Sequence, residues 1–165
     1  MEQTSEIKNT SQTKSDELLQ LVSFDIGGEE FGVDILKVQE IIRFIEVTRV
    51  PNTPEYIDGV INLRGKVIPI IDLRRKFGIE RKEKDKNTRI IVVELKNKVI
   101  GFVVDAVSEV LRIPSSVTEP PPPIIGGIEA EYITAIGKLE NRLLILLDLD
   151  RVLIGQEQEE LKNVA

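Results

Sequence analysis

The chain has 165 residues and a formal net charge of −6 at pH 7, and 41% of its residues are hydrophobic but only 4% aromatic, so we expect a globular protein with an aliphatic core. The absence of His and Cys removes disulfides and the commonest general base and metal ligand, which disfavours most enzymes. Net acidity disfavours nucleic-acid binding, which needs clustered Lys and Arg.

The N-terminal segment, residues 1–17, is rich in Ser, Thr, Gln, Lys and Glu. Such a segment buries too little apolar surface to fold, so we expect a flexible tail. No apolar run follows Met1 as in a signal peptide, and no stretch approaches the roughly 18 apolar residues of a membrane span. We therefore expect a cytoplasmic protein that does not insert into the membrane.

Short apolar runs separated by turn signals predict β-strands after the tail. Those of the first half cover residues 21–26, 29–35, 38–43, 59–63 and 66–72. Gly27-Gly28 and Arg64-Gly65 predict hairpin turns, and Pro69 indicates an edge or a bulge in its strand. Residues 73–77 followed by Gly78 predict a helical turn.

A charged linker over residues 79–87 precedes a second set of runs. They cover residues 89–95, 98–104, 107–113, 133–139 and 142–149. The four prolines at 120–123 predict an extended loop, which either stiffens the chain or serves as a polyproline ligand. From Asp150 the pattern is helical, and residues 156–165 form the expected C-terminal helix end.

The two sets of strands are related by an internal repeat. A shift of 69 positions aligns Gly32 with Gly101 and Glu40 with Glu109, and a shift of 76 aligns Asp72 with Asp148. The difference of 7 residues indicates one insertion, expected in the proline-rich loop. We therefore predict an all-β protein with two similar five-stranded barrels and a cleft between them. Repeat one covers about residues 20–80 and repeat two about 89–153.

Four charged residues are candidates for chemistry or contact. Asp72 and Asp148 form a possible acid–base pair, but each precedes a helical turn, so N-capping is favoured. Arg64 at a hairpin tip is able to reach a partner's carboxylate. The alternative for Arg64 and Glu40 is a surface ion pair that contributes little, and the residues alone leave both open.

Several motifs resemble the CheW family of bacterial chemotaxis coupling proteins. They are FGVDILKVQEI from Phe31, GVINLRG from Gly59, VIPIIDL from Val67, GFVVDAV from Gly101 and LLILLDL from Leu143. The resemblance covers residues 18–155 and is most specific at Asn62, Leu63, Arg64 and Gly65. It implies two five-stranded SH3-like barrels, with short helical turns and strands that are exchanged between the barrels.

The resemblance also implies a function. Members of the family are non-enzymatic adaptors that couple the cytoplasmic tips of methyl-accepting chemoreceptors to the regulatory domain of the histidine kinase CheA, at the inner face of the membrane. By position, Glu40 and the hairpin residues Asn62, Leu63, Arg64 and Gly65 are expected to bind partners. Val38, Ile41, Val104 and Val107 are candidates for an apolar groove that receives the receptor tip. No metal or cofactor is expected.

Three alternatives remain. They are a regulatory scaffold of a related two-component pathway, a nucleic-acid-binding barrel protein, and an enzyme. Small barrels often bind nucleic acids, but stacking aromatics are scarce in this chain.

Overall fold

The computed structural model describes residues 17–122, 124–125 and 128–152. The tail predicted over residues 1–17 lies, except for Glu17, outside the described residues. The C-terminal helix end predicted over residues 156–165 lies wholly outside them.

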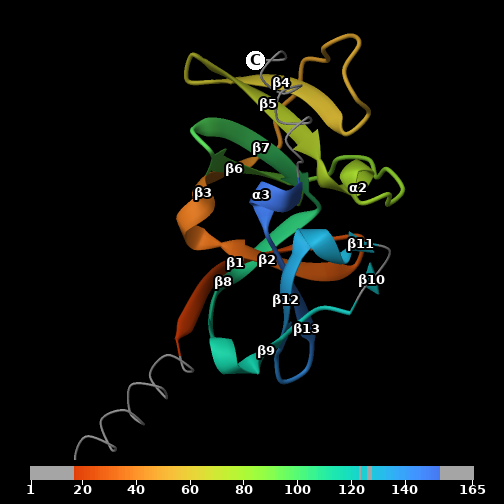
Figure 1. The fold of residues 1–165 in the computed structure, drawn as a ribbon. Coiled ribbons are helices and arrows are strands. Elements are labelled where there is room, and N and C mark those ends of the chain that lie inside the picture. Colours follow the sequence, from red (N-terminus) through yellow and green to blue (C-terminus); the bar gives the residue numbers. More distant parts are fainter. Residues whose placement is uncertain (1–16, 123, 126–127, 153–165) are drawn as a thin grey trace, which may run out of the picture.

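Most of the described strands belong to two large sheets in which antiparallel pairs predominate (Figure 1). The five-stranded sheet runs in the order β3 (Val38–Arg43), β6 (Arg89–Leu95), β7 (Lys98–Val104), β5 (Lys66–Asp72) and β4 (Ile57–Leu63). The six-stranded sheet runs in the order β8 (Ala106–Pro114), β1 (Leu18–Ile26), β2 (Glu29–Asp34), β13 (Leu143–Leu147), β12 (Ile133–Lys138) and β9 (Thr118–Glu119). The predicted all-β class is confirmed.

Short elements connect the strands or, in the case of α3, follow the last one. They are η1 (Ile35–Lys37), α2 (Leu73–Lys76), η2 (Ser115–Val117), η3 (Ala130–Tyr132), α3 (Leu149–Val152) and the small pair β10 (Ile124–Ile125) and β11 (Ile128–Glu129). The six-stranded sheet has one strand more than the five expected in each barrel, because it includes the two-residue strand β9. A two-residue strand is too short to leave a period in the sequence.

Both large sheets close into barrels, the first through the segment after β3 and the second through the segment after β8. Thr48, which follows β3, forms a bridge with Val60 of β4, and β9, which follows β8, pairs with β12. We call them the five-stranded and the six-stranded barrel. β5 lies between β7 and β4, so it is not the edge strand that Pro69 indicated. Its pairing with β7 begins at Ile70, so Pro69 interrupts no bond of that ladder.

Each barrel contains strands from both halves of the chain. The β1–β2 hairpin of the first half lies in the six-stranded barrel with strands of the second half, and the β6–β7 hairpin lies in the five-stranded barrel with strands of the first. Four pairings join strands of different halves, two of them antiparallel, β1 with β8 and β3 with β6, and two of them parallel, β2 with β13 and β5 with β7. The two repeats therefore do not coincide with the two barrels.

The repeat is preserved in the register of these pairings. Gly32 lies opposite Leu146, and Gly101 lies opposite Ile70. The two pairs are equivalent, because the shift of 69 aligns Gly32 with Gly101 and the shift of 76 aligns Ile70 with Leu146. A Cβ on Gly101 would lie 2.6 Å from Ile70 Cδ1, and one on Gly32 would lie 3.2 Å from Leu146 Cδ2. Glycine at both positions thus permits the close approach of the exchanged strands, and the molecule has an approximate twofold symmetry.

The main core lies between the barrels and takes residues from both. Phe24 and Phe31 of the six-stranded barrel pack in one cluster with Ile71, Ile91 and Phe102 of the five-stranded barrel. Smaller clusters fill the inside of each barrel. The space between the barrels, predicted as a cleft, is therefore filled by the core.

Candidate partner-binding surface

The conformation of the β4–β5 hairpin is set by the four residues singled out in the sequence. Asn62 Oδ1 accepts a hydrogen bond from the N–H of Gly65 at 2.8 Å, and Leu63 is half-buried against the core of the five-stranded barrel. Arg64 and Gly65 have φ of 51° and 84°, the left-handed pair that tight hairpins need. These contacts present the Arg64 side chain to solvent.

Arg64 forms an ion pair with Glu40 of β3. Its Nη2 donates to Glu40 Oε1, and the side chains are 71% and 29% exposed. The predicted surface ion pair is thus present. A guanidinium has five N–H donors, so Arg64 keeps donors for a partner's carboxylate while Glu40 orients it.

The four apolar groove candidates do not share one environment. Ile41 is 38% exposed, whereas Val38 and Val107 are half-buried against the central core. Val104 is 1% exposed and belongs to the core, so we remove it from the predicted contact surface. Val104 is the last residue of β7, which lies between β6 and β5 with both faces covered, so strand alternation did not reveal its position.

The six-stranded barrel repeats the ion pair. Arg142 Nη2 lies 3.0 Å from Oε1 of Glu109, and its Nε lies 2.7 Å from Oε1 of Glu30. Glu109 is equivalent to Glu40 under the shift of 69, but the residue equivalent to Arg64 is Glu140. The second barrel thus supplies its guanidinium from two residues further along the hairpin. A position-by-position alignment of the two repeats misses this pair, because Arg64 aligns with Glu140 and not with Arg142. The alignment of Glu40 with Glu109 was the signal in the sequence that pointed to it.

Exposed aliphatic side chains follow the same symmetry. Ile41 at 38% corresponds to Val110 at 57%, and Val67 at 51% corresponds to Leu143 at 61%. Each barrel therefore carries an ion pair on an outer strand and hairpin together with two exposed aliphatic residues. Two surfaces of like composition are a basis for contacts with other proteins.

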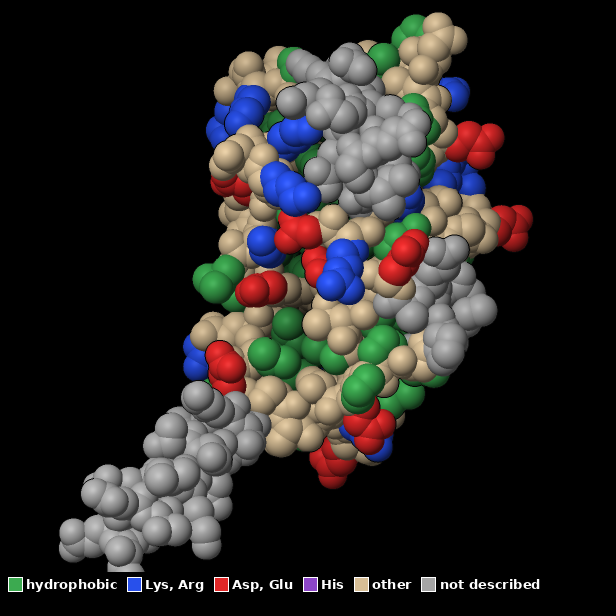
Figure 2. Space-filling model, in the orientation of Figure 1, with side chains coloured by type: hydrophobic (Ala, Val, Ile, Leu, Met, Phe, Trp, Pro, Cys, Tyr) green, Lys and Arg blue, Asp and Glu red, His purple; other side chains and the backbone are tan. Residues whose placement is uncertain are grey.

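An open pocket of about 500 Å³ lies where the chain leaves β2. Its lining includes Ile35, Lys37 and the 88%-exposed Leu36 on one side and Leu149 and Asp150 of α3 on another. Val38, the first residue of β3, directly follows the lining residue Lys37 in the chain. On the face drawn in Figure 2, hydrophobic side chains gather in a hollow below a band of mixed charges.

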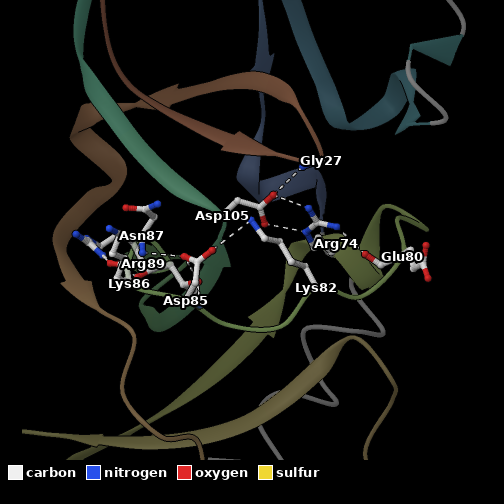
Figure 3. A network of polar contacts seen from close by, with 10 residues as sticks. Gly27, Arg74, Glu80, Lys82, Asp85, Lys86, Asn87, Arg89 and Asp105 are labelled. Carbon is white, nitrogen blue, oxygen red and sulfur yellow. Dashed lines mark hydrogen bonds and ion pairs between the residues drawn. The ribbon is translucent and has the colours of Figure 1, made fainter.

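A second polar network, missed in the sequence, joins the two barrels (Figure 3). Arg74 Nε and Nη2 donate to the two carboxylate oxygens of Asp105 at 2.8 and 2.6 Å, and Asp105 also accepts from the N–H of Gly27 at 2.9 Å. Burial raises the pKa of Asp105, but the bonds from Arg74 and Gly27 outweigh burial, so this pKa lies below the ordinary value of 3.8.

The two candidate catalytic carboxylates are helix caps. Asp72 Oδ1 accepts from the N–H of Arg74, and Asp148 Oδ1 accepts from the N–H of Asp150, both at 3.0 Å. Asp72 is 2% exposed, and its Oδ2 lies 3.8 Å from Lys84 Nζ. The capping interpretation is therefore confirmed for both residues.

The described part of the chain holds neither a metal-binding cluster nor a membrane-spanning helix. No group of three or more His, Cys, Asp or Glu there is placed to hold a metal ion. No helix within those residues has the length and apolarity to cross a membrane.

Two strand-exchanged barrels with exposed ion pairs on their hairpins define a class, the duplicated β-barrel module of protein interaction. Residues 20–157 match the family of the CheW-like domain. The chain belongs to the CheW family, a family of non-enzymatic scaffolding proteins, and acts as an adaptor in the chemotaxis pathway.

Individual relatives agree with this assignment. The chain is 46% identical to the chemotaxis protein CheW of Klebsiella aerogenes over 142 residues, 86% of each chain. It is 38% identical to CheW of Helicobacter pylori over 144 residues, 87% of each. The crystal structure of the scaffolding protein TtCheW from Thermoanaerobacter tengcongensis superposes with a TM-score of 0.77 at 39% identity, covering 84% of this chain and 89% of that one.

Proposed function

We propose that this adaptor couples the cytoplasmic tips of methyl-accepting chemoreceptors to the regulatory domain of the CheA histidine kinase. The observation that carries the proposal is the Arg64 side chain, which is 71% exposed on a hairpin fixed by Asn62 and Gly65. A positively charged group held in place before binding loses little conformational entropy on contact. Glu40 orients that group and completes the polar part of the surface.

The apolar part of the receptor contact is proposed at the pocket beside η1. The pocket holds about 500 Å³ and is lined by Ile35 and Leu36, and Val38 begins the next strand. Such a surface suits an amphipathic helical tip that inserts apolar anchors. Ile41 and Val107 extend the surface along β3 and β8, which lie on the same flank in Figure 1.

The kinase contact is proposed at the barrel ends, since the regulatory domain of the CheA kinase has a similar fold. The adaptor would then be recruited from the cytoplasm to receptor arrays at the inner face of the membrane. The Arg142–Glu109 pair offers the six-stranded barrel a polar surface of its own. Two such surfaces allow one chain to hold two partners.

A pull-down tests the proposal. The full chain is mixed with a receptor cytoplasmic fragment, with the kinase regulatory domain, and with both. We expect binding to each and a three-component complex when both are present. Lack of binding to either partner at micromolar concentration refutes the proposal.

A further inference from the structure

In the described parts of the chain, the backbone passes from one barrel to the other at two places. The first crossing, η1 (Ile35–Lys37), connects β2 to β3, and the second crossing, Asp105, connects β7 to β8. The other described connections stay within one barrel, apart from those that lead into and out of the separate pair of β10 and β11 between β9 and β12. The angle between the barrels therefore depends on these two crossings and on the core between them.

Each crossing is joined by an ion pair to one of the two short helices. Asp105 pairs with Arg74 of α2, and Lys37 pairs with Asp150 of α3. Arg74 and Asp150 occupy equivalent positions under the shift of 76. The approximate symmetry thus preserves the connection between helix and crossing but reverses its charges.

The two connections differ in strength. Arg74 and Asp105 make two hydrogen bonds of 2.8 and 2.6 Å with both side chains 16% exposed, and Arg74 also donates to the carbonyl of Glu80 at 2.7 Å. Lys37 and Asp150 make a single contact of 3.3 Å with side chains 45% and 32% exposed. Bidentate pairs sheltered from water are the stronger kind, and exposed single pairs contribute little.

Asp105 at the second crossing also forms hydrogen bonds with the β1–β2 hairpin of the six-stranded barrel. Asp105 accepts the N–H of Gly27 at the β1–β2 turn, and its own N–H donates to the carbonyl of Asp25 at 2.9 Å. α2 of the five-stranded barrel is thereby joined through one carboxylate to a hairpin of the six-stranded barrel, as Figure 3 shows.

We infer that Arg74 and Asp105 are positioning residues that fix the angle between the barrels, while the first crossing is the place where that angle changes. The inference rests on the proposed function in one respect, because a fixed angle matters to an adaptor that holds two partners at once. The pocket of about 500 Å³ is lined by Lys37 and Asp150, so a change of angle at the first crossing changes the shape of the proposed receptor contact.

Distance measurements between the barrels test the inference directly. The chain has no Cys, so Lys66→Cys and Ser116→Cys, both at exposed positions, place one spin label on each side. We expect Asp105→Asn to broaden the label–label distance distribution and the matched control Lys37→Gln to leave it unchanged. Identical distributions for Asp105→Asn and the parent, or equal broadening by Lys37→Gln, would overturn the inference.

A milder variant decides the outcome if Asp105→Asn fails to fold, as judged by far-ultraviolet circular dichroism. Arg74→Lys keeps the charge but loses the planar fork, and it is expected to broaden the distribution with the secondary structure intact. An unbroadened distribution in folded Arg74→Lys would then overturn the inference.

Binding provides the second readout. In Arg74→Lys we expect the affinity for each single partner to stay within about twofold, while formation of the three-component complex weakens about tenfold, a usual size for coupling between sites. An unchanged three-component complex would refute the link to assembly. If the parent chain binds neither partner, the proposed function fails, but the distance measurements still test the positioning role.

Discussion

Replacement of Arg64 by Ala separates a binding role from a structural one. Arg64 is 71% exposed and its partner Glu40 29% exposed, and exposed ion pairs contribute at most about 1 kcal/mol to folding. For a chain of this size, ~1 kcal/mol corresponds to about 2–4 °C in the melting temperature. The turn itself is retained, because the bond from Gly65 to Asn62 does not involve the Arg64 side chain.

The expected result is a small thermal shift together with a large loss of partner affinity. Removing a charged contact at the centre of an interface costs about 2 kcal/mol or more, which is at least about 30-fold in Kd. Scanning calorimetry gives the melting temperature, and surface plasmon resonance with the receptor fragment and the kinase regulatory domain gives Kd. Arg64→Lys is the matched control, which keeps the charge and is expected to bind with intermediate affinity. Unchanged affinities, or a melting temperature lowered by about 10 °C or more, which exceeds the shift worked from an exposed pair, would refute the reasoning.

Three further predictions concern the second barrel, a glycine and the network between the barrels. Arg142→Ala removes the contact with Glu109 and is expected to weaken the three-component complex. Because the pair is exposed, the melting temperature should stay within about 4 °C of the parent. Unchanged assembly in the pull-down would contradict a binding role. Gly59→Ala would place a Cβ 2.2 Å from the carbonyl oxygen of Thr48, so we expect a loss of about 3 kcal/mol or more in urea unfolding, and normal stability would contradict the described closure of the barrel. The pKa of Asp105 is lower in the folded chain than its ordinary 3.8, so its contribution to stability is present above that pH and is lost as pH falls through the folded pKa. The parent should therefore be more stable than Asp105→Asn at pH 7, and the difference should shrink in thermal melts as the pH is lowered below about 4; a difference that does not change with pH would refute this assignment.

The repeat was predictable because equivalent residues recur at constant spacings along the sequence. Shifts of 69 and 76 align Gly32 with Gly101 and Asp72 with Asp148, and the structure gives the paired residues equivalent neighbours. The exchange of hairpins was not predictable from the same spacing. Gly32 and Gly101 align whether each hairpin stays with its own half or crosses to the other, because the local sequence is the same in both cases. The family resemblance, not the periodicity, supplied the expectation of exchange.

The candidate site was predictable only in part, for reasons that differ between residues. Arg64 lies in a tight turn whose residues have fixed backbone requirements, so its exposure followed from local sequence. Val104 lies in a strand covered on both faces, where alternation carries no information about exposure. Arg142 and Asp105 find their partners across the fold, at distances along the chain that no local pattern records. Side chains that join distant elements are thus the part of a site that sequence reasoning misses.

Exchange of the hairpins gives the adaptor one folding unit from two barrels. The β1–β2 hairpin supplies Phe24 and Phe31 to the core, yet its strand neighbours in the six-stranded barrel, β8 and β13, come from the second half. Neither half alone holds the strands of a complete barrel, so the pairing energy of each barrel is realised only when both halves are present. Two barrels joined by a simple linker would instead move independently, which is the default for separate domains. The exchange, together with the Arg74–Asp105 pair at the second crossing, removes most of that freedom and leaves the exposed Lys37–Asp150 pair as the weaker connection. A scaffold that transmits the state of one partner to another needs this arrangement, because a displacement at one surface reaches the other only through a connection that does not bend freely.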